Sequence, residues 1–598
     1  MTTKIITNYF RLHNVKQFRE SINETANSVY YVFTGRHLPY ANGDSTTESV
    51  INSVNEHLYT AYDEMLFGKR VSASDVCAVA PRYSWAPNTV YSAYRSNEDL
   101  TDKAYYVCVN ASSSYHIFKC LDNNGNTASL YQPEVTQTSP DDDFYSTADG
   151  YVWKYMYSVD ASTFNKFATA DYMPVIANNQ VVGNSINGSI DVIIVTTKGS
   201  NYDSYLSNTF NVSDIRVGGN ALRYNLANSA SANSGFYKNS FIYIKQGTGF
   251  GQGRKIVDYN VSANSKLITL ESSFDTTPDV TSVYEITPAV LITGDGEGAT
   301  ARALVNSSSG NSIYQIEILT RGNNYTYATA EVLGNTGGVQ NNAVLTIMLG
   351  PKGGHGADPE YELGASALCI SATFANTESG SIPTENDFRT IGLIKDPLYA
   401  NVELTVSSLT GNFTIGEVVT QSNTQATGVV TEFDAIDTLA VSNVNGVFVT
   451  GYTITGSTSG STGNLVSYKI SGKVKNFNTF DQRHRYTYQE IIGSLANDEQ
   501  VYQTFSNGAY SANAYVHSAV AVSGSGNLYL THVRGTLNTA NTLIGTENSG
   551  GGEASANLIF YYPPDLVVGS GEVLYVENRS PISRANTQSE TVKLILQF

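Results

Sequence analysis

Short runs of alternating apolar and polar residues, separated by Gly, Asn and Ser, fill two long stretches of this chain. They occupy residues 186–355 and 400–565, and NSFIYIKQGTGFGQGRKIVDYN (239–260) is typical of them. Successive side chains of a strand point to opposite faces, so a period of two indicates strands buried on one face. Strands that recur about every 8–12 residues with turn residues between them predict small antiparallel sandwiches or barrels.

The segment 400–565 also resembles itself. An aromatic residue, Phe413 and again Phe448, is followed three positions later by Gly, then by a strand, a polar turn and a strand of small residues. A weaker copy begins at Leu537. Duplicated β units bury one face against each other, and three copies are too few for a solenoid. We therefore expect inserted modules with internal repeats.

The first 185 residues mix helix and strand. Ser45 and Glu48 stand at capping-box spacing before apolar residues at helical intervals that run to Met65, and Gly68 follows where a helix would stop. A shorter helix is expected around Val15 and Ile22. Strand-like runs such as SVYYVFTG, KAYYVCVN and GYVWKYMYSV lie around them. The fold class that we expect is α+β, dominated by β structure.

Composition limits the classes of function. The formal net charge of −18 opposes a general phosphate-binding surface, so no nucleic-acid partner is expected. Nowhere do 18 apolar residues run together, so we expect no membrane span, and MTTKIITNYFRLHNVKQF has no apolar core of a secretory signal. The four cysteines form no CxxC pair, which is typical of reduced thiols in a protein made and kept in a cytoplasm-like compartment. Tyr is abundant, at 41 copies, and suits large contact surfaces as well as an ordinary β-rich exterior.

Few segments suggest chemistry. GTGFGQGRK (247–255) lies between two strand patterns rather than before a helix, so we interpret it as a hairpin turn and not a nucleotide loop. Asp141, Asp142 and Asp143 are interpreted as a solvated acidic loop rather than a calcium site. His116 and Cys120 are too far apart along one strand to form a metal pair by themselves. A carboxylate pair of the glycosidase kind is compatible with the 53 acidic residues, but no pair stands out. No catalytic, cofactor-binding or metal-binding residue is assigned.

Segments outside the Gly-rich stretches resemble a known family. They are VYYVFTGRHLPY (29–40), VCAVAPRYSW (76–85), HIFKCLD (116–122), ADGYVWKYMYSV (148–159), ISATFANTESGSIPTENDFRTIGLIKDPL (370–398) and GEVLYVENRSPI (571–582). In this order they are similar to gene product eight, the baseplate wedge protein of T-even-like, contractile-tailed bacteriophages. The resemblance implies a structural virion protein of the tail baseplate, assembled in the host cytoplasm. It implies a homodimer that contacts other wedge proteins, rearranges when the tail contracts, and has no enzymatic activity and no cofactor.

Members of that family can be close to half the length of this chain, and the excess here lies between the matching segments. We therefore expect residues 1–185, 356–399 and 566–598 to form one discontinuous core, with insertions at 186–355 and 400–565. The chain end supports a returning strand, since Val592, Leu594, Leu596 and Phe598 alternate in TVKLILQF. Either this strand closes a sheet of the same chain, or it pairs with another subunit by strand addition.

Several residues in the matching segments have two readings. Trp85 and Trp153 are the only tryptophans, and each suits either a core or a subunit interface. Arg36, Arg82 and Arg579 adjoin turn-like residues and suit either loop bracing or an interface, so they are not offered as a binding site. The alternative functions are a receptor- or glycan-binding tail fibre component that uses the β insertions, or a polysaccharide depolymerase.

Overall fold

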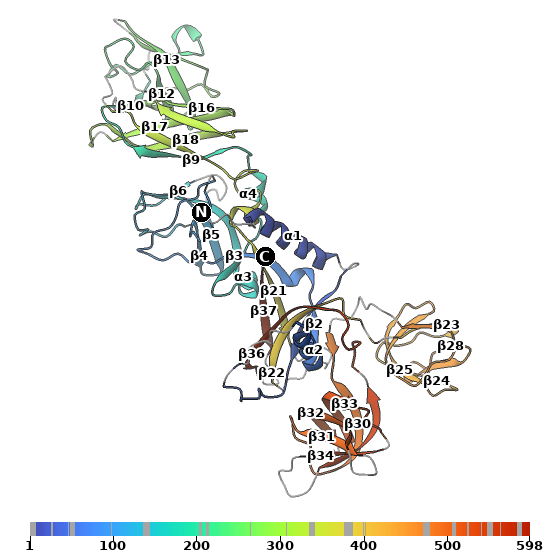
Figure 1. Ribbon diagram of the computed structural model, residues 1–598. Helices are drawn as coiled ribbons and strands as arrows, with labels where there is room; N and C mark the ends of the chain where they lie inside the picture. Colours follow the sequence, from blue (N-terminus) through green and yellow to red (C-terminus); the bar gives the residue numbers. More distant parts are fainter. Residues whose placement is uncertain are drawn as a thin grey trace. The chain divides into compact units, whose positions relative to one another are not determined.

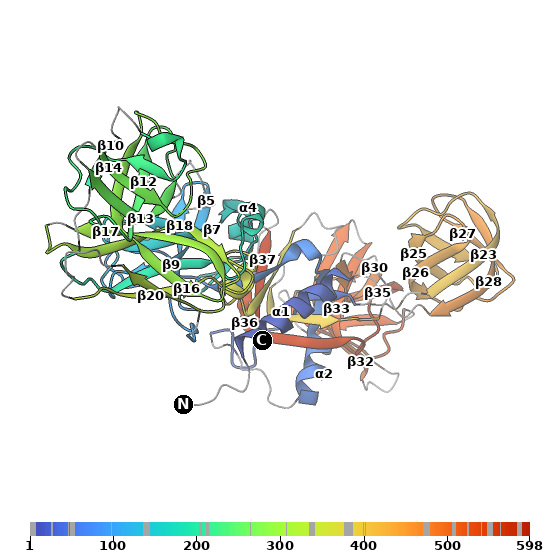
Figure 2. The same cartoon turned by 90° about the horizontal axis from the view of Figure 1, so that it is seen from above.

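The computed structural model shows a chain built mainly of short antiparallel strands (Figures 1 and 2). The residues that the structure describes are 7–24, 28–45, 47, 54–96, 98–134, 144–202, 206–210, 215–262, 265–306, 308–333, 341–375, 387–398, 400, 402–470, 479–504, 510–522, 525–539, 541–546, 554–562, 564–582 and 589–598. The predicted fold class, α+β with dominant β structure in small sheets and barrels, is confirmed. Within the described part of the chain, no helix is long and apolar enough to span a membrane.

The chain divides into two compact units, which are described separately. Unit 1 comprises residues 1–12, 78–367 and 598, and unit 2 comprises residues 13–77 and 368–597. Helix α1 (Asn8–Asn23), which includes the short helix expected around Val15 and Ile22, contains the first boundary.

The central sheet of unit 2 combines strands from distant parts of the sequence. Its order is β29-β2-β1-β22-β36. The bounds are β1 Tyr30–Gly35, β2 Met65–Arg70, β22 Phe388–Lys395, β29 Thr479–Asp481 and β36 Glu572–Ile582. Every residue of β1 is buried, which agrees with the near-continuous apolar run YYVFTG of a strand covered on both faces. Antiparallel partners such as Phe33 and Gly392 bring the first and later segments together, and the Phe33 ring packs where a Gly392 side chain would stand.

One helix prediction is wrong at its C-terminal end. The helix is α2 (Val54–Glu64), and Met65 already begins β2 instead of completing the last turn. Met65, Leu66 and Phe67 are all buried, so pairing in the sheet stabilises this run more than one further helical turn would. Gly68 is no helix stop: it pairs with Phe33 in β1, and the ring of Phe480 lies against it. Glu48, in the predicted cap, lies outside the described residues.

Two closed six-stranded barrels occupy the segment 402–562 of unit 2. The first barrel consists of β23 Val402–Thr410, β24 Val418–Gln421, β25 Thr427–Phe433, β26 Thr438–Asn445, β27 Thr453–Gly456 and β28 Thr462–Ile470. The second consists of β30 His484–Ile492, β31 Gln500–Thr504, β32 Tyr510–Val522, β33 Ser525–Gly535, β34 Thr542–Gly545 and β35 Ser555–Tyr562. In both, the first strand pairs with the fourth and sixth, and the second strand pairs with the third and fifth. Figure 2 shows the ring of strands in the first barrel.

The repeats noticed in the sequence are halves of these barrels. Phe413 and Phe448 each precede a hairpin of the first barrel, and Leu537 precedes one of the second. All three side chains are buried in the barrel cores. The fourth half begins at Leu495, which is buried in the same way and which the sequence comparison missed. The segment therefore contains two copies of one module, each with internal two-fold repetition.

Unit 1 has a four-stranded sheet with an aromatic core. Its order is β4-β5-β7-β6, with β4 Tyr106–Ala111, β5 Ser114–Asn123, β6 Phe144–Ser146 and β7 Tyr151–Asp160. Strand β3 (Val76–Pro81) pairs with β8 (Tyr172–Pro174), and the helices are α3 Ala161–Phe167, α4 Asn179–Gly183 and α5 Pro359–Glu362. A short 3₁₀ helix, Ala73–Asp75, precedes β3. Trp153 is fully buried and stacks on Tyr151 with ring centroids 5.3 Å apart, so its core reading is confirmed.

Residues 190–349 of unit 1 contain two modules, one nested in the other. The outer module is formed by β9 Ile190–Thr197, β16 Val290–Gly294, β17 Glu297–Asn306, β18 Ser312–Asn323, β19 Ala328–Val332 and β20 Val344–Leu349. The inner module is a six-stranded sheet of β10 Leu206–Thr209, β11 Arg223–Asn225, β12 Ser240–Gln246, β13 Gly253–Ser262, β14 Ser265–Leu270 and β15 Val283–Pro288, with the 3₁₀ turn Val217–Gly219. Each has its own hydrophobic core. Strand β20 pairs with β9, which brings the two ends of the outer module together.

The C-terminal segment forms the expected strand and pairs within the chain. Strand β37 (Glu590–Gln597) lies beside β21 (Ala367–Phe374) in a sheet. Val592 and Leu594 are buried, and Leu596 and Phe598 are half-buried. The backbone N–H of Phe598 donates to the carbonyl of Ser366 at 3.4 Å. Of the two alternatives for this strand, the structure shows the intramolecular one.

Candidate functional site

The glycine cluster 247–255 forms a hairpin turn, as predicted. It joins β12 to β13, and Gly247, Gly249 and Gly251 all have positive φ. The Thr248 hydroxyl donates to Asp279 at 2.7 Å, and the Gln252 side-chain amide donates to the Thr276 carbonyl at 3.0 Å. The turn is therefore held by polar contacts with residues 276–279. It precedes a strand, not a helix whose N-terminus could bind a phosphate.

The other sequence candidates do not converge on one site. His116 contacts the Ser158 hydroxyl at 2.6 Å, whereas Cys120 is buried opposite Trp153 in the β5–β7 ladder. Burial raises the pKa of the Cys120 thiol well above its ordinary value, which opposes thiolate chemistry. Asp141, Asp142 and Asp143 lie outside the described residues. Among the described residues, no three or more His, Cys, Asp and Glu side chains are arranged to hold a metal ion.

Two of the singled-out arginines make contacts within the chain. Arg82 donates to the Thr169 carbonyl at 3.2 Å, and Arg36, with φ of 54°, lies over the Tyr40 ring at 4.5 Å. The Arg579 side chain pairs with Glu577 two residues earlier on the same strand, at 3.1 Å. Trp85 is half-buried, and its indole N–H donates to the Ser129 hydroxyl at 3.2 Å. These contacts are structural.

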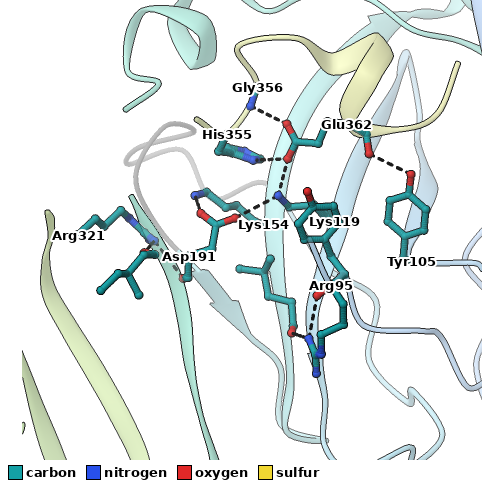
Figure 3. Close-up of polar contacts among 12 residues, drawn as sticks. Arg95, Tyr105, Lys119, Lys154, Asp191, Arg321, His355, Gly356 and Glu362 are labelled. Atoms are coloured by element: carbon teal, nitrogen blue, oxygen red, sulfur yellow. Dashed lines mark hydrogen bonds and ion pairs between the residues drawn. The ribbon is translucent and has the colours of Figure 1, made fainter. Parts of the chain in front are cut away.

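A buried ionic network in unit 1 is the most concentrated group of charges in the described chain (Figure 3). Lys119 of β5 and Lys154 of β7 both contact Asp191 of β9, at 3.2 and 3.0 Å. Lys119 also pairs with Glu362 of α5, and its ammonium lies 4.2 Å from the centroid of the Tyr94 ring. The side chains of Lys119, Asp191 and Glu362 are fully buried.

Residues near the C-terminal end of the segment 186–355 complete this network. His355 contacts Glu362 at 2.9 Å and donates to the Tyr155 carbonyl at 2.7 Å. The backbone N–H of Gly356 donates to the second carboxylate oxygen of Glu362 at 2.7 Å. Arg321 of β18 donates to the carbonyls of Ile190 and Asp191, each at 3.0 Å.

The pKa values follow from this pairing. Burial alone would raise the pKa of Glu362, but Lys119 and then His355 hold it at about 2. Lys154 and Lys119 likewise hold the pKa of Asp191 well below its ordinary value, against the effect of burial. Burial lowers the pKa of Lys154 to about 8, although Asp191 acts in the opposite direction. Both carboxylates are therefore ionised at neutral pH, as a paired buried network requires.

The position of the network indicates its role. Asp191 lies in the strand with which the segment 186–355 begins, and His355 and Glu362 lie where the chain returns. Lys119 and Lys154 belong to the four-stranded sheet. The network thus fixes both ends of this segment to the same two strands of unit 1.

A second polar junction, in unit 2, joins three sequence segments. Arg389 of β22 is buried and holds the Asp44 carboxylate with two nitrogens, at 2.7 and 2.6 Å. Its third donor reaches the His37 carbonyl. The Tyr40 hydroxyl donates to the Arg579 carbonyl at 2.7 Å and lies 3.2 Å from the Arg389 carbonyl. Sequence reasoning did not single out Arg389, although it lies in a matching segment.

Three histidines lie between the second barrel and the strands β1 and β2 of unit 2. His37 is buried and contacts Asp498 at 2.7 Å and the Thr531 hydroxyl at 2.5 Å. Its ring centroid is 5.2 Å from that of His517 and 6.2 Å from that of His532. These histidines also escaped the sequence analysis, because they come from three separate strands or turns.

Comparison with known proteins identifies one part of the chain. Residues 478–598 match the family model Phage-Gp8, described as bacteriophage T4 Gp8. The matched part begins just before β29 and contains the whole second barrel, β36 and β37. A search among curated proteins found no match.

Proposed function

We propose that the chain is a structural wedge subunit of a phage tail baseplate, on the premise that residues 478–598 match the Phage-Gp8 family model. The observation that carries the proposal is the match over the second barrel and the two C-terminal strands. The match supports a structural role in a phage baseplate. The wedge position, the homodimer, the absence of catalysis, and assembly in the host cytoplasm are parts of the proposal.

The proposed core is discontinuous and combines residues 1–185, 356–399 and 566–598. Its support is the strand order in unit 2, where β22 lies between β1 and β36. Arg389, Asp44 and Tyr40 connect the same three segments through polar contacts. A sheet that pairs strands from early and late parts of the chain resists separation of those parts, which suits a structural subunit.

The proposed contacts with neighbouring subunits need apolar surface. Tyr9 and Phe10 of α1 expose 67% and 52% of their area, and Tyr361 lies beside Tyr9 with ring centroids 6.2 Å apart. Aromatic residues are enriched in the centre of protein interfaces, where they bury much area at little conformational cost. Such surfaces would allow the subunit to hold one baseplate arrangement and adopt another on contraction.

Light scattering coupled to size-exclusion chromatography tests the homodimer. We expect twice the chain mass of 64.6 kDa at micromolar concentration. A clean monomer would contradict the dimer. A density map of the intact virion tests the wedge position, and placement of this chain in a fibre or in the capsid would contradict it.

A further inference from the structure

The second barrel meets the rest of unit 2 through titratable groups on both sides. His37 follows β1, His517 is in β32 and His532 is in β33. His517 and His37 are almost completely inaccessible to solvent. Asp63 of α2 pairs with Arg534 of β33 through both carboxylate oxygens, at 2.8 and 2.6 Å.

Arg483 fixes the protonation state that His517 must have. A guanidinium can only donate, so the contact of 3.2 Å between Arg483 Nη1 and His517 Nδ1 makes Nδ1 an acceptor. The ring is then neutral, with its proton on Nε2, and that tautomer leaves no nitrogen lone pair for a metal. A second proton would place an imidazolium against a guanidinium.

The first barrel shows that the module does not need these histidines. Val516 pairs with Leu530 in the second barrel as Val430 pairs with Val441 in the first. Gly535 packs on Ala512 in the same way as Gly446 packs on Ala426. These equivalences place Thr431 at the position of His517, Asn443 at that of His532 and Asn445 at that of Arg534. The titratable residues therefore belong to the junction and not to the barrel fold.

We propose that His517 and His532, which pack against His37, form a proton-sensitive latch that holds the second barrel on the sheet of unit 2 while both imidazoles are neutral and loosens it when they are protonated. The proposal goes beyond the structural role in a baseplate and does not depend on it. It concerns a joint inside one chain, so it can be tested on the isolated protein.

Each arginine around the latch is paired with a carboxylate. Arg36 pairs with Glu64 at 3.5 Å, Arg483 with Asp481 at 2.6 Å and Arg534 with Asp63 at 2.6 Å. Asp498 is the carboxylate that faces His37. Asp63, which already pairs with Arg534, also lies 3.7 Å from His532 Nε2, so a proton on His532 must share that carboxylate with Arg534. A proton on His517 adds positive charge directly beside Arg483.

The direction of the pH effect follows from the pKa values. Burial, then Arg483 and His37, hold the pKa of His517 well below its ordinary value. Burial also lowers the pKa of His532, although Asp63 opposes this. Since the unfolded histidines titrate near 6.5, the latch is fully closed above about pH 6.5 and weakens as the pH falls. Asp565, whose carboxylate accepts from the Asp481 amide, acts in the opposite direction because burial raises its pKa to about 7.

Hydrogen exchange of the full-length chain at pH 7.5 and 5.5, corrected for the intrinsic rate, tests the latch. The reporter is the amide of Gln482, which donates to the Leu66 carbonyl across the junction at 2.6 Å. In the Asp565→Asn variant, which removes the opposing titration, we expect the exchange of this amide to rise at least about tenfold at pH 5.5, the factor for one pKa unit, while amides of the first barrel keep their protection. Equal protection of Gln482 at both pH values in that variant would overturn the proposal.

Variants separate the histidines from other acid effects. His517→Asn retains an acceptor for Arg483, and His532→Asn suits the positive φ of 50° and copies the residue of the first barrel. The double variant should lose most of the acid response, whereas His116→Asn in unit 1 should retain it. An unchanged acid response in the double variant would refute the latch. Should that variant fail to fold, deuterium exchange at the imidazole C2 of the wild-type protein decides, because a pKa of 6.5 or more for His517 contradicts the proposal.

Discussion

Gln421 in the first barrel and Gln503 in the second make the same pair of hydrogen bonds. The Gln421 amide donates to the Val449 carbonyl at 2.7 Å, and its oxygen accepts from the Val449 N–H at 2.8 Å. Gln503 makes the corresponding contacts with Asn538, at 2.8 and 2.7 Å. Both side chains are completely buried. Each glutamine therefore ties the end of the second strand to the loop before the fifth strand.

Replacing either glutamine by leucine should destabilise its barrel. Gln503→Leu removes the two hydrogen bonds to the Asn538 backbone and the one to the Asn541 carbonyl, at a net cost of about 0.5–1.5 kcal/mol for each bond. Chemical denaturation followed by fluorescence measures the loss. Gln489→Leu, at an exposed position of the same barrel, should change the free energy of unfolding by less than about 0.5 kcal/mol. Equal effects of the two substitutions would contradict the stabilising role of the Gln503 hydrogen bonds.

Removing one carboxylate from the ionic network should destabilise unit 1 strongly. Asp191→Asn leaves the ammonium groups of Lys119 and Lys154 short of a buried negative charge, which costs about 3–5 kcal/mol. Thermal unfolding measured by calorimetry detects the change. Glu98→Gln breaks the exposed Glu98–Lys103 pair at 2.8 Å and is the matched control, with an expected cost below about 1 kcal/mol.

The pH dependence of unit 2 should contain a contribution from Asp565. Its folded pKa of about 7 exceeds the unfolded value, so the stabilisation is fully present below about pH 4 and is lost as the pH rises through 7. Asp565→Asn removes this loss and retains an acceptor for the Asp481 amide. We expect the variant to be more stable than the wild type by roughly 1–3 kcal/mol at pH 8 and to differ little at pH 4. Denaturation curves at the two pH values check this, and a wild type that is the more stable protein at pH 8 would contradict it.

Arg389 should not tolerate lysine. A single ammonium cannot reproduce the two parallel bonds to Asp44 together with the bond to the His37 carbonyl. We expect Arg389→Lys to cost about 2–3 kcal/mol of unfolding free energy. Arg579→Lys changes a half-exposed pair with Glu577 and should cost less than about 1 kcal/mol. Parallel urea titrations compare the two, and indistinguishable midpoints would argue against the bracing role.

The internal repeats and the predominance of short strands could be predicted from the sequence, because both depend on local periodicity. The half-barrel at Leu495 escaped notice because it departs from the pattern at two positions. Leu495 replaces the aromatic residue, and Asp498 stands where Gly416 and Gly451 provide positive φ. Asp498 adopts a φ of 65°, which acidic and amide side chains tolerate better than most. The positive φ is therefore retained at this position, although the glycine that would indicate it is absent.

The polar junctions could not be predicted, because their members meet only after folding. A local sign was nevertheless present: IFKCL, VWKYM and SIDVII each place one charge inside an apolar strand. A charge buried in this way needs a partner, so Lys119, Lys154 and Asp191 could have been expected to meet one another. The end of α2 was missed for a different reason, since sheet pairing outweighed the helical spacing that continued to Met65.

The attachment of residues 186–355 at both ends has a mechanical consequence. A push on the outer or the inner module reaches β5 and β7 through two buried ammonium groups, not through a swivelling tether. The module and the four-stranded sheet should then turn together as one lever arm. A force applied to the inner module should be transmitted to the strands that carry Lys119 and Lys154.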